Sequence, residues 1–141
     1  MIIGSNDKYR LTNRELDILN ILWESERSLV ASEITSIRED LSINTVQAVL
    51  KKLLHKELIQ IDEIVYSGTV LSRSYKPTLT PEEFEIKRFT TSYSNTSGKP
   101  FSPSNLLVTL LEEEKDSAKV LSEIDNLEKY LATKKQELKK K

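Results

Sequence analysis

The order of local signals between residues 11 and 77, three helical patterns and then strand-like sequence, limits this chain to few folds. The segment Thr12–Glu15 fits a capping box, in which hydroxyl and carboxylate side chains accept from the backbone at the start of a helix. Leu16, Leu19 and Leu22 then recur at helical spacing. We therefore predict a helix that begins just after Thr12 and buries one apolar stripe, together with Trp23.

Two further helices are predicted before residue 57. Ser28 is a candidate cap for a short second helix, and Ser42 is a candidate cap for a third helix over about 43–56. The buried stripe expected on the third helix consists of Val46, Val49, Leu50, Leu53 and Leu54. The spacing of these residues leaves one side of the third helix facing solvent.

The sequence after Glu57 changes to strand character. Residues 58–66 and 69–77 are rich in β-branched, aromatic and other apolar residues, and Ser67 and Gly68 between them are typical of a turn. We expect Tyr66 and Tyr75 to be packing residues. Three helices followed by a hairpin predict a mainly α fold with a small β-hairpin wing, the winged helix-turn-helix arrangement.

The remaining residues predict a helical region. Thr80–Glu83 forms a second capping box, residues 92–104 are rich in Ser, Pro and Gly, and two more helices are expected over about 104–114 and from about 117 onward. In the last helix, alternating four- and three-residue steps give the spacing of a coiled-coil seam. The residues at these positions are Val120, Ile124, Leu127, Leu131, Lys134 and Leu138. We predict a winged-helix domain over residues 8–80 and a helical dimerisation domain over 81–141, with a loop or hinge at about 92–104. The expected dimer contacts are Leu106, Leu107, Leu110, Leu111, Val120, Ile124, Leu127 and Leu131.

Composition excludes several chemistries. The chain has no Cys and one His, so thiol catalysis, thiolate metal sites and a multi-histidine site within one chain are excluded. The three glycines form no phosphate-binding loop, and no stretch approaches the ~20 apolar residues of a membrane span. We expect a cytoplasmic protein that is not an enzyme, uses no cofactor and does not enter a membrane.

One locally basic stretch stands out in a chain whose net charge is −1. Residues 41–60 carry Lys51, Lys52 and Lys56 against a single acid, Glu57. Short polar side chains that can reach base edges accompany these lysines on the third helix. Ordinary solvation of an amphipathic helix would produce the same pattern, so composition alone leaves both interpretations open.

The residues that would contact DNA fall in two groups. On the third helix and its cap they are Ser42, Asn44, Thr45, Gln47, Ala48, Lys51 and Lys52. Gln47 can bond adenine, and the lysines suit phosphates. Arg73 and Lys76 are the candidates on the wing, although Asp62 and Glu63 on the opposite strand would repel the same backbone.

These motifs together resemble the penicillinase repressor family. The similar segments, in order, are Leu11–Glu24, Glu33–Ile34, Thr45–Leu53 and Tyr75–Pro77. The resemblance implies a homodimer whose winged helices bind the two halves of a palindromic operator, with the third helix in the major groove. It also implies C-terminal helices that intertwine to form the dimer.

The chain departs from that family where signals are received. Copper-responsive members carry a C-terminal cysteine cluster, which this chain lacks, and β-lactam-responsive members are cleaved at an Asn-Phe bond that is missing from residues 107–111. Glu57 also stands where many members have Gly, so we expect a left-handed backbone there or a different turn.

Three functions therefore remain open. The leading hypothesis is a dimeric repressor that binds double-stranded operator DNA and is relieved by an unidentified inducer or protease. The alternatives are a winged-helix protein-interaction module and a ligand-sensing regulator that does not read an operator directly.

Overall fold

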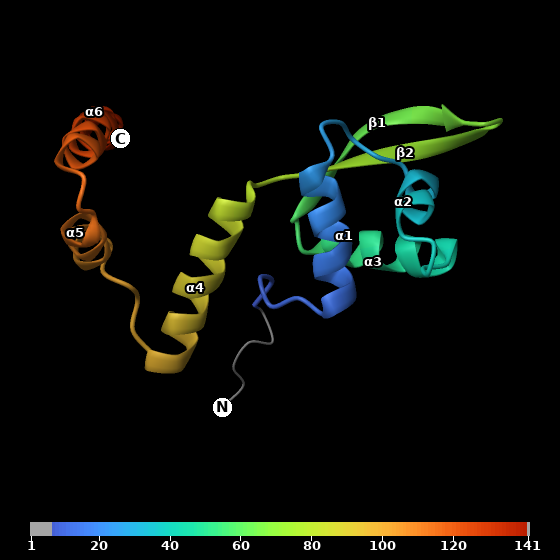
Figure 1. Cartoon of the computed structure of the whole chain (residues 1–141), viewed down its shortest axis with the longest axis horizontal. Helices are drawn as coiled ribbons and strands as arrows, with labels where there is room; N and C mark the ends of the chain where they lie inside the picture. Colours follow the sequence, from blue (N-terminus) through green and yellow to red (C-terminus); the bar gives the residue numbers. More distant parts are fainter. Residues whose placement is uncertain (1–6, 141) are drawn as a thin grey trace. The chain divides into compact units, whose positions relative to one another are not determined.

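The structure is a computed structural model that describes residues 7–140. Its elements, in chain order, are α1 (Asn13–Glu24), α2 (Ala31–Ile37), α3 (Ile43–His55), β1 (Ile59–Ser67), β2 (Val70–Pro77), α4 (Pro81–Ser97), α5 (Pro103–Glu113) and α6 (Ser117–Lys139). The chain divides into two compact units, one ending at Pro100 and the other beginning at Phe101. Three helices followed by an antiparallel hairpin confirm the predicted winged-helix arrangement (Figure 1).

The core of the first unit lies where α1, α2, α3 and the base of the hairpin meet. Ile18 and Leu19 of α1, Ile34 of α2 and Leu53 of α3 are completely buried there, together with Leu58 and Ile59 at the start of the hairpin. Each of these side chains removes apolar surface from water, which is the main stabilising contribution. The buried stripe predicted for α3 is confirmed, except that Leu54 is half-buried.

Both predicted capping boxes are present. Thr12 Oγ1 accepts from the Glu15 backbone N–H at 3.2 Å, and Glu15 Oε1 accepts from the Thr12 N–H at 2.9 Å. Thr80 and Glu83 make the same reciprocal pair at the start of α4. Ser42 caps α3 as expected.

The cap of α2 was predicted wrongly. Val30 is the N-cap, and Glu33 Oε1 accepts from its N–H at 3.0 Å. Leu29 pairs with Tyr75 of β2 in an isolated bridge, so the helix begins only after Val30 and Ser28 lies too far upstream to cap it. The Ser28 hydroxyl instead donates to Ser74 Oγ.

The end of α3 requires a left-handed residue, and Glu57 supplies it with φ 62°. Glu57 N–H donates to Leu54 O and Leu58 N–H donates to Leu53 O, the hydrogen-bond pattern of a Schellman motif. Leu53 and Leu58 are both buried, so the apolar contact typical of this motif accompanies it. A non-glycine residue at such a position costs about 1 kcal/mol.

The hairpin β1–β2 is antiparallel and contains one irregularity. Ile61 pairs with Tyr75 and Glu63 pairs with Ser74, so Asp62 is an extra residue in β1. Ser74 is buried, donates to the Glu63 carbonyl and accepts from the Glu63 N–H, which holds the bulge in place. Tyr75 packs against the core as predicted, but Tyr66 is 73% exposed because the hairpin beyond the bulge leaves the core.

The first turn of α4 packs against α1 and the segment before it. Phe84 is buried, with its ring centroid 5.4 Å from Trp23 and 5.9 Å from Tyr9. Trp23 is half-buried and donates Nε1–H to Leu79 O at 2.9 Å. These contacts join the first turn of α4 to the winged helix. The domain boundary predicted at residue 80 remains a prediction.

The loop predicted over 92–104 is shorter in the structure. Helix α4 continues to Ser97 and ends at Gly98, which has φ 73°. Helix α5 begins at Pro103 with Ser102 as its cap. Ser92 and Ser97, two of the serines that suggested a loop, occupy exposed helical positions where their polarity is compatible with solvent.

One ion pair connects the start of α1 with the end of α3. Glu15 is only 3% exposed, and Lys56 Nζ lies 3.1 Å from its Oε2 and 3.4 Å from its Oε1. The same ammonium donates to Arg10 O at 3.4 Å. Burial raises the pKa of Glu15, but hydrogen bonds from Thr12 and Lys56 outweigh burial, and the pKa is lowered overall. The pair therefore stabilises the fold above the ordinary carboxyl pKa and loses this contribution as the pH falls through the lowered value.

We predict that Lys56→Met destabilises the protein by about 2 to 3 kcal/mol, because it leaves a buried carboxylate without its cation. Urea unfolding at neutral pH measures the change. Adding Glu15→Gln to that variant should recover part of the loss, and equal stability of Lys56→Met and the unmodified chain would contradict the assigned role.

Candidate nucleic-acid interface

The side of α3 opposite the core carries the polar residues predicted to contact DNA. Asn44, Gln47, Ala48, Lys51 and Lys52 are all exposed. Residues four apart lie on the same side of a helix, so Asn44, Ala48 and Lys52 form one row and Gln47 and Lys51 a second. No acidic residue lies in α3, so both rows are free of carboxylates.

Two hydroxyls at the start of α3 are engaged with each other. Ser42 Oγ accepts from the Thr45 N–H at 3.1 Å and donates to Thr45 Oγ1 at 3.0 Å. Thr45 is half-buried. Both residues hold the start of the helix, and their hydroxyls are already engaged there.

A hollow of about 480 Å³ lies between α3, the start of α2 and the hairpin. Gln47 and Ile43 line it from α3, and Leu71 and Arg73 line it from β2. The structure therefore brings together two residues predicted from separate sequence segments, Gln47 and Arg73. Ile43 was not predicted as part of this site, although the signal was present: an apolar residue at the first helical position lies outside the buried stripe.

The two wing cations differ in their surroundings. Lys76 Nζ lies 3.0 Å from Asp62 Oδ1, and hydrogen bonds from Lys76 and then Ser28 lower the pKa of Asp62. Arg73 is exposed and makes no ion pair with any residue between 7 and 140. Arg73 is thus the wing cation open to a new anion, whereas Lys76 would have to leave Asp62.

The wing beyond the bulge is largely apolar. Ile64 pairs with Arg73 and Tyr66 pairs with Leu71, and because alternate residues share a face, these four side chains lie on one face of the hairpin. Ile64, Tyr66 and Leu71 are exposed. Charge on this face comes from Arg73 alone.

An ionic cluster fixes the turn between α2 and α3. Arg38 donates to both oxygens of Asp40 at 2.9 Å, and it also lies 3.2 Å from Asp17 of α1. Arg14 lies 3.5 Å from Asp40. The hydrogen bonds to Asp40 and then Asp17 raise the pKa of Arg38, and those from Arg38 lower the pKa of Asp40 to about 2. The cluster thus pairs the Asp40 carboxylate, two residues before the cap of α3, with two guanidinium groups.

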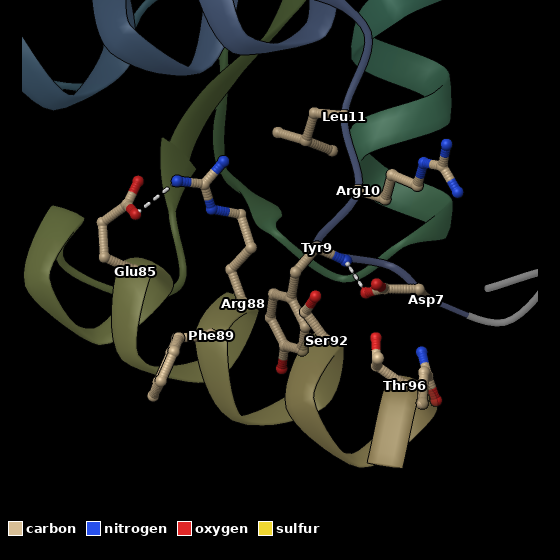
Figure 2. A pocket seen from close by; sticks show the side chains of 10 residues that line it. Asp7, Tyr9, Arg10, Leu11, Glu85, Arg88, Phe89, Ser92 and Thr96 are labelled. Atoms are coloured by element: carbon tan, nitrogen blue, oxygen red, sulfur yellow. Dashed lines mark hydrogen bonds and ion pairs between the residues drawn. The ribbon is translucent and has the colours of Figure 1, made fainter. Parts of the chain in front are cut away.

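A second hollow of about 550 Å³ separates the segment before α1 from α4. Figure 2 shows the Tyr9 ring between Arg88 and Ser92, with the Arg10 side chain pointing away from Arg88. Arg88 donates to Glu85 at 2.6 Å, and Asp7 accepts from the Tyr9 N–H at 3.0 Å. Because these charged groups already have partners, the hollow does not indicate the chemistry of a ligand.

The predicted dimer contacts lie on α5 and α6. None of the residues of these two helices is fully buried. Leu110 and Leu131 are exposed, and the half-buried members of the set are Leu106, Leu107, Leu111, Val120, Ile124 and Leu127. The second unit therefore presents an apolar stripe that its own two helices cover incompletely.

Two absences within residues 7–140 bear on other functions. No three or more His, Asp or Glu side chains gather there in a way that could hold a metal ion. No helix in this part of the chain is both long and apolar enough to cross a membrane.

Comparisons with known proteins give one informative match. A family model described as penicillinase repressor matches residues 11–133. No curated protein sequence matches the chain. Among solved structures, the adhesin competence repressor AdcR from Streptococcus pyogenes is similar at 19% identity and a TM-score of 0.39, over 89% of this chain and 83% of that chain. A TM-score this low carries no weight for the fold or the function.

We predict that the Asp40 carboxyl titrates at about 2 in the folded protein and that Arg38→Gln raises this pKa toward the ordinary value of about 3.9. Because the pKa of Asp40 is lower in the folded protein, its pairing with Arg38 contributes fully to stability above the ordinary carboxyl pKa. This contribution is lost as the pH falls through about 2. Carboxyl carbon NMR, recorded over a pH series on the unmodified protein and on the variant, measures the pKa. An unchanged Asp40 pKa in the variant would contradict the assigned pairing.

Proposed function

The chain belongs to the penicillinase repressor family of DNA-binding transcriptional regulators, and we propose that it represses by binding a pseudo-palindromic operator as a homodimer. In this proposal α3 lies in the major groove of each half-site and the wing lies along the adjacent backbone. The observation that carries the proposal is the exposed, acid-free face of α3, which shares one hollow with Arg73 of the wing.

The side chains on the exposed face of α3 suit two kinds of contact, one to base edges and one to phosphates. Gln47 lines the hollow near the start of α3, where a recognition helix contacts base edges, and its amide can bond adenine through two hydrogen bonds. Lys51 lies one turn further along, and Lys52 continues the neighbouring row. Their long, exposed ammonium groups suit phosphate contacts, which fix register without reading sequence.

The second unit supports the homodimer. Helices with an apolar stripe depend on packing for their stability, and α5 and α6 contain no fully buried residue of their own. Leu131 is 55% exposed at a predicted seam position. A second copy would cover this stripe and would make the second half-site encounter effectively intramolecular.

A contact with another protein through the wing is the second candidate function. Ile64, Tyr66 and Leu71 are exposed together on one face of the hairpin, which is unusual for a surface that meets only phosphates. An interaction module of this kind would show no saturable, sequence-dependent binding to DNA.

We predict that Lys51→Ala weakens binding to all DNA sequences and reduces the dependence of log affinity on log salt by about 1 per half-site. Gln47→Ala should instead relax the preference at one base pair per half-site, at a cost of about 1 to 3 kcal/mol there. Fluorescence anisotropy on the DNA upstream of the gene, over a salt series, measures both effects.

Lys87→Ala serves as the matched control, because Lys87 is an equally exposed lysine on α4. Its affinity and salt dependence should equal those of the unmodified protein. Normal operator binding by the double variant Gln47→Ala/Lys51→Ala would show that another surface reads the DNA.

We also predict that Leu131→Glu dissociates the dimer, because it places a charge in the apolar seam. Sedimentation equilibrium measures the mass in solution, and operator affinity should fall together with dimerisation. Ala132→Glu adds the same charge at the neighbouring position, off the seam, and should leave the dimer intact. A monomeric unmodified protein, or equal effects of the two variants, would contradict this assignment.

A further inference from the structure

Ile43 exposes an apolar side chain at the start of the recognition helix. It is the first residue of α3, follows the capping residue Ser42, and is 40% exposed. Ile43 does not belong to the hydrophobic core of the described residues and is not among the apolar residues packed against it. An exposed β-branched residue at this position therefore contributes little to the core of the fold.

The neighbours of Ile43 place it within the DNA-facing surface. Gln47 lies one helical turn further along the same side, and both residues line the hollow closed on its other side by Leu71 and Arg73. Ala31 and Ser32 of α2 and other residues of β2 complete the lining. Within it, the apolar side chains of Ile43 and Leu71 lie beside the amide of Gln47 and the guanidinium of Arg73. A ligand that fits such a wall offers a methyl group beside hydrogen-bonding atoms.

An A·T base pair offers that combination in the major groove. Thymine presents its C5-methyl group, and adenine presents the N6 donor and the N7 acceptor. Residues four apart on a helix are separated by about 6 Å along its axis, and neighbouring base pairs by about 3.4 Å, so the two side chains reach base pairs that lie within about two steps of each other.

We propose that Ile43 reads thymine by packing against its C5-methyl group, beside the adenine contact of Gln47. This inference rests on the proposed function and specifies which base pair the start of α3 selects. Other residues of α3 are less suited to the methyl contact. Thr45 is half-buried and engaged with Ser42, and Ala48 extends only one carbon from the backbone.

The test replaces thymine with deoxyuridine, which removes the methyl group and leaves every hydrogen-bonding atom unchanged. Footprinting first locates the operator, and each thymine of a half-site is then replaced in turn, symmetrically in both halves. We expect about a four-fold loss of affinity per half-site at one position, the size expected for one lost buried methyl contact. In Ile43→Ala, the same replacement should cause no further loss.

Ile61→Ala provides the matched control, because Ile61 is 39% exposed, lies on β1 and does not line the hollow. This variant should keep the full sensitivity to deoxyuridine. Circular dichroism confirms folding of each variant, and Ile43→Ser, which has no γ-methyl group, repeats the comparison if Ile43→Ala does not fold.

The outcomes separate the two proposals. Saturable operator binding in which Ile43→Ala retains the full deoxyuridine effect would overturn the role of Ile43 while leaving the repressor function intact. Operator binding that is insensitive to deoxyuridine at every position would do the same. Absence of sequence-dependent binding by the unmodified protein would overturn the repressor function and the thymine contact with it.

Discussion

The buried carboxylate of Glu15 is the constraint on which the geometry of the first unit depends. Its charge is costly to hold in the protein interior, and two segments must converge to compensate it. The Thr12 N–H donates to the carboxylate from the start of α1, and the ammonium of Lys56, which also donates to the Arg10 carbonyl, pairs with it from the end of α3. Because Lys56 directly follows α3, the start of α1 is tied to the end of the helix that faces DNA in our proposal. The orientation of α3 therefore follows from an electrostatic requirement as well as from apolar packing.

The two units solve the problem of apolar burial differently. The first unit encloses its own core and leaves one side of α3 and one face of the wing exposed. The second unit has no fully buried residue in either helix, so its stability as part of a folded protein depends on a further surface. This difference matches the proposed roles, in which the first unit contacts DNA and the second unit forms the dimer.

Local signals in the sequence predicted most of the fold because they depend on neighbouring residues. The caps at Thr12, Ser42 and Thr80, the buried stripe of α3 and the left-handed conformation considered for Glu57 are all present. Non-local contacts account for the errors. The pairing of Leu29 with Tyr75 moved the start of α2, and the bulge at Asp62 carried Tyr66 away from the core. Sequence also predicted the polar face of α3, but only the hollow between α3 and the hairpin identified Ile43 as part of it.

The contact between Asp62 and Lys76 has a consequence for how such a protein would search a chromosome. Condensed cations leave a duplex when basic side chains replace them, and this release drives attachment to random sequence. With Lys76 held by an internal carboxylate, the wing offers one guanidinium rather than two basic groups. Attachment to the vast excess of random duplex is thereby kept weak. A small number of molecules can then remain available for the few sites at which base contacts add to the binding free energy.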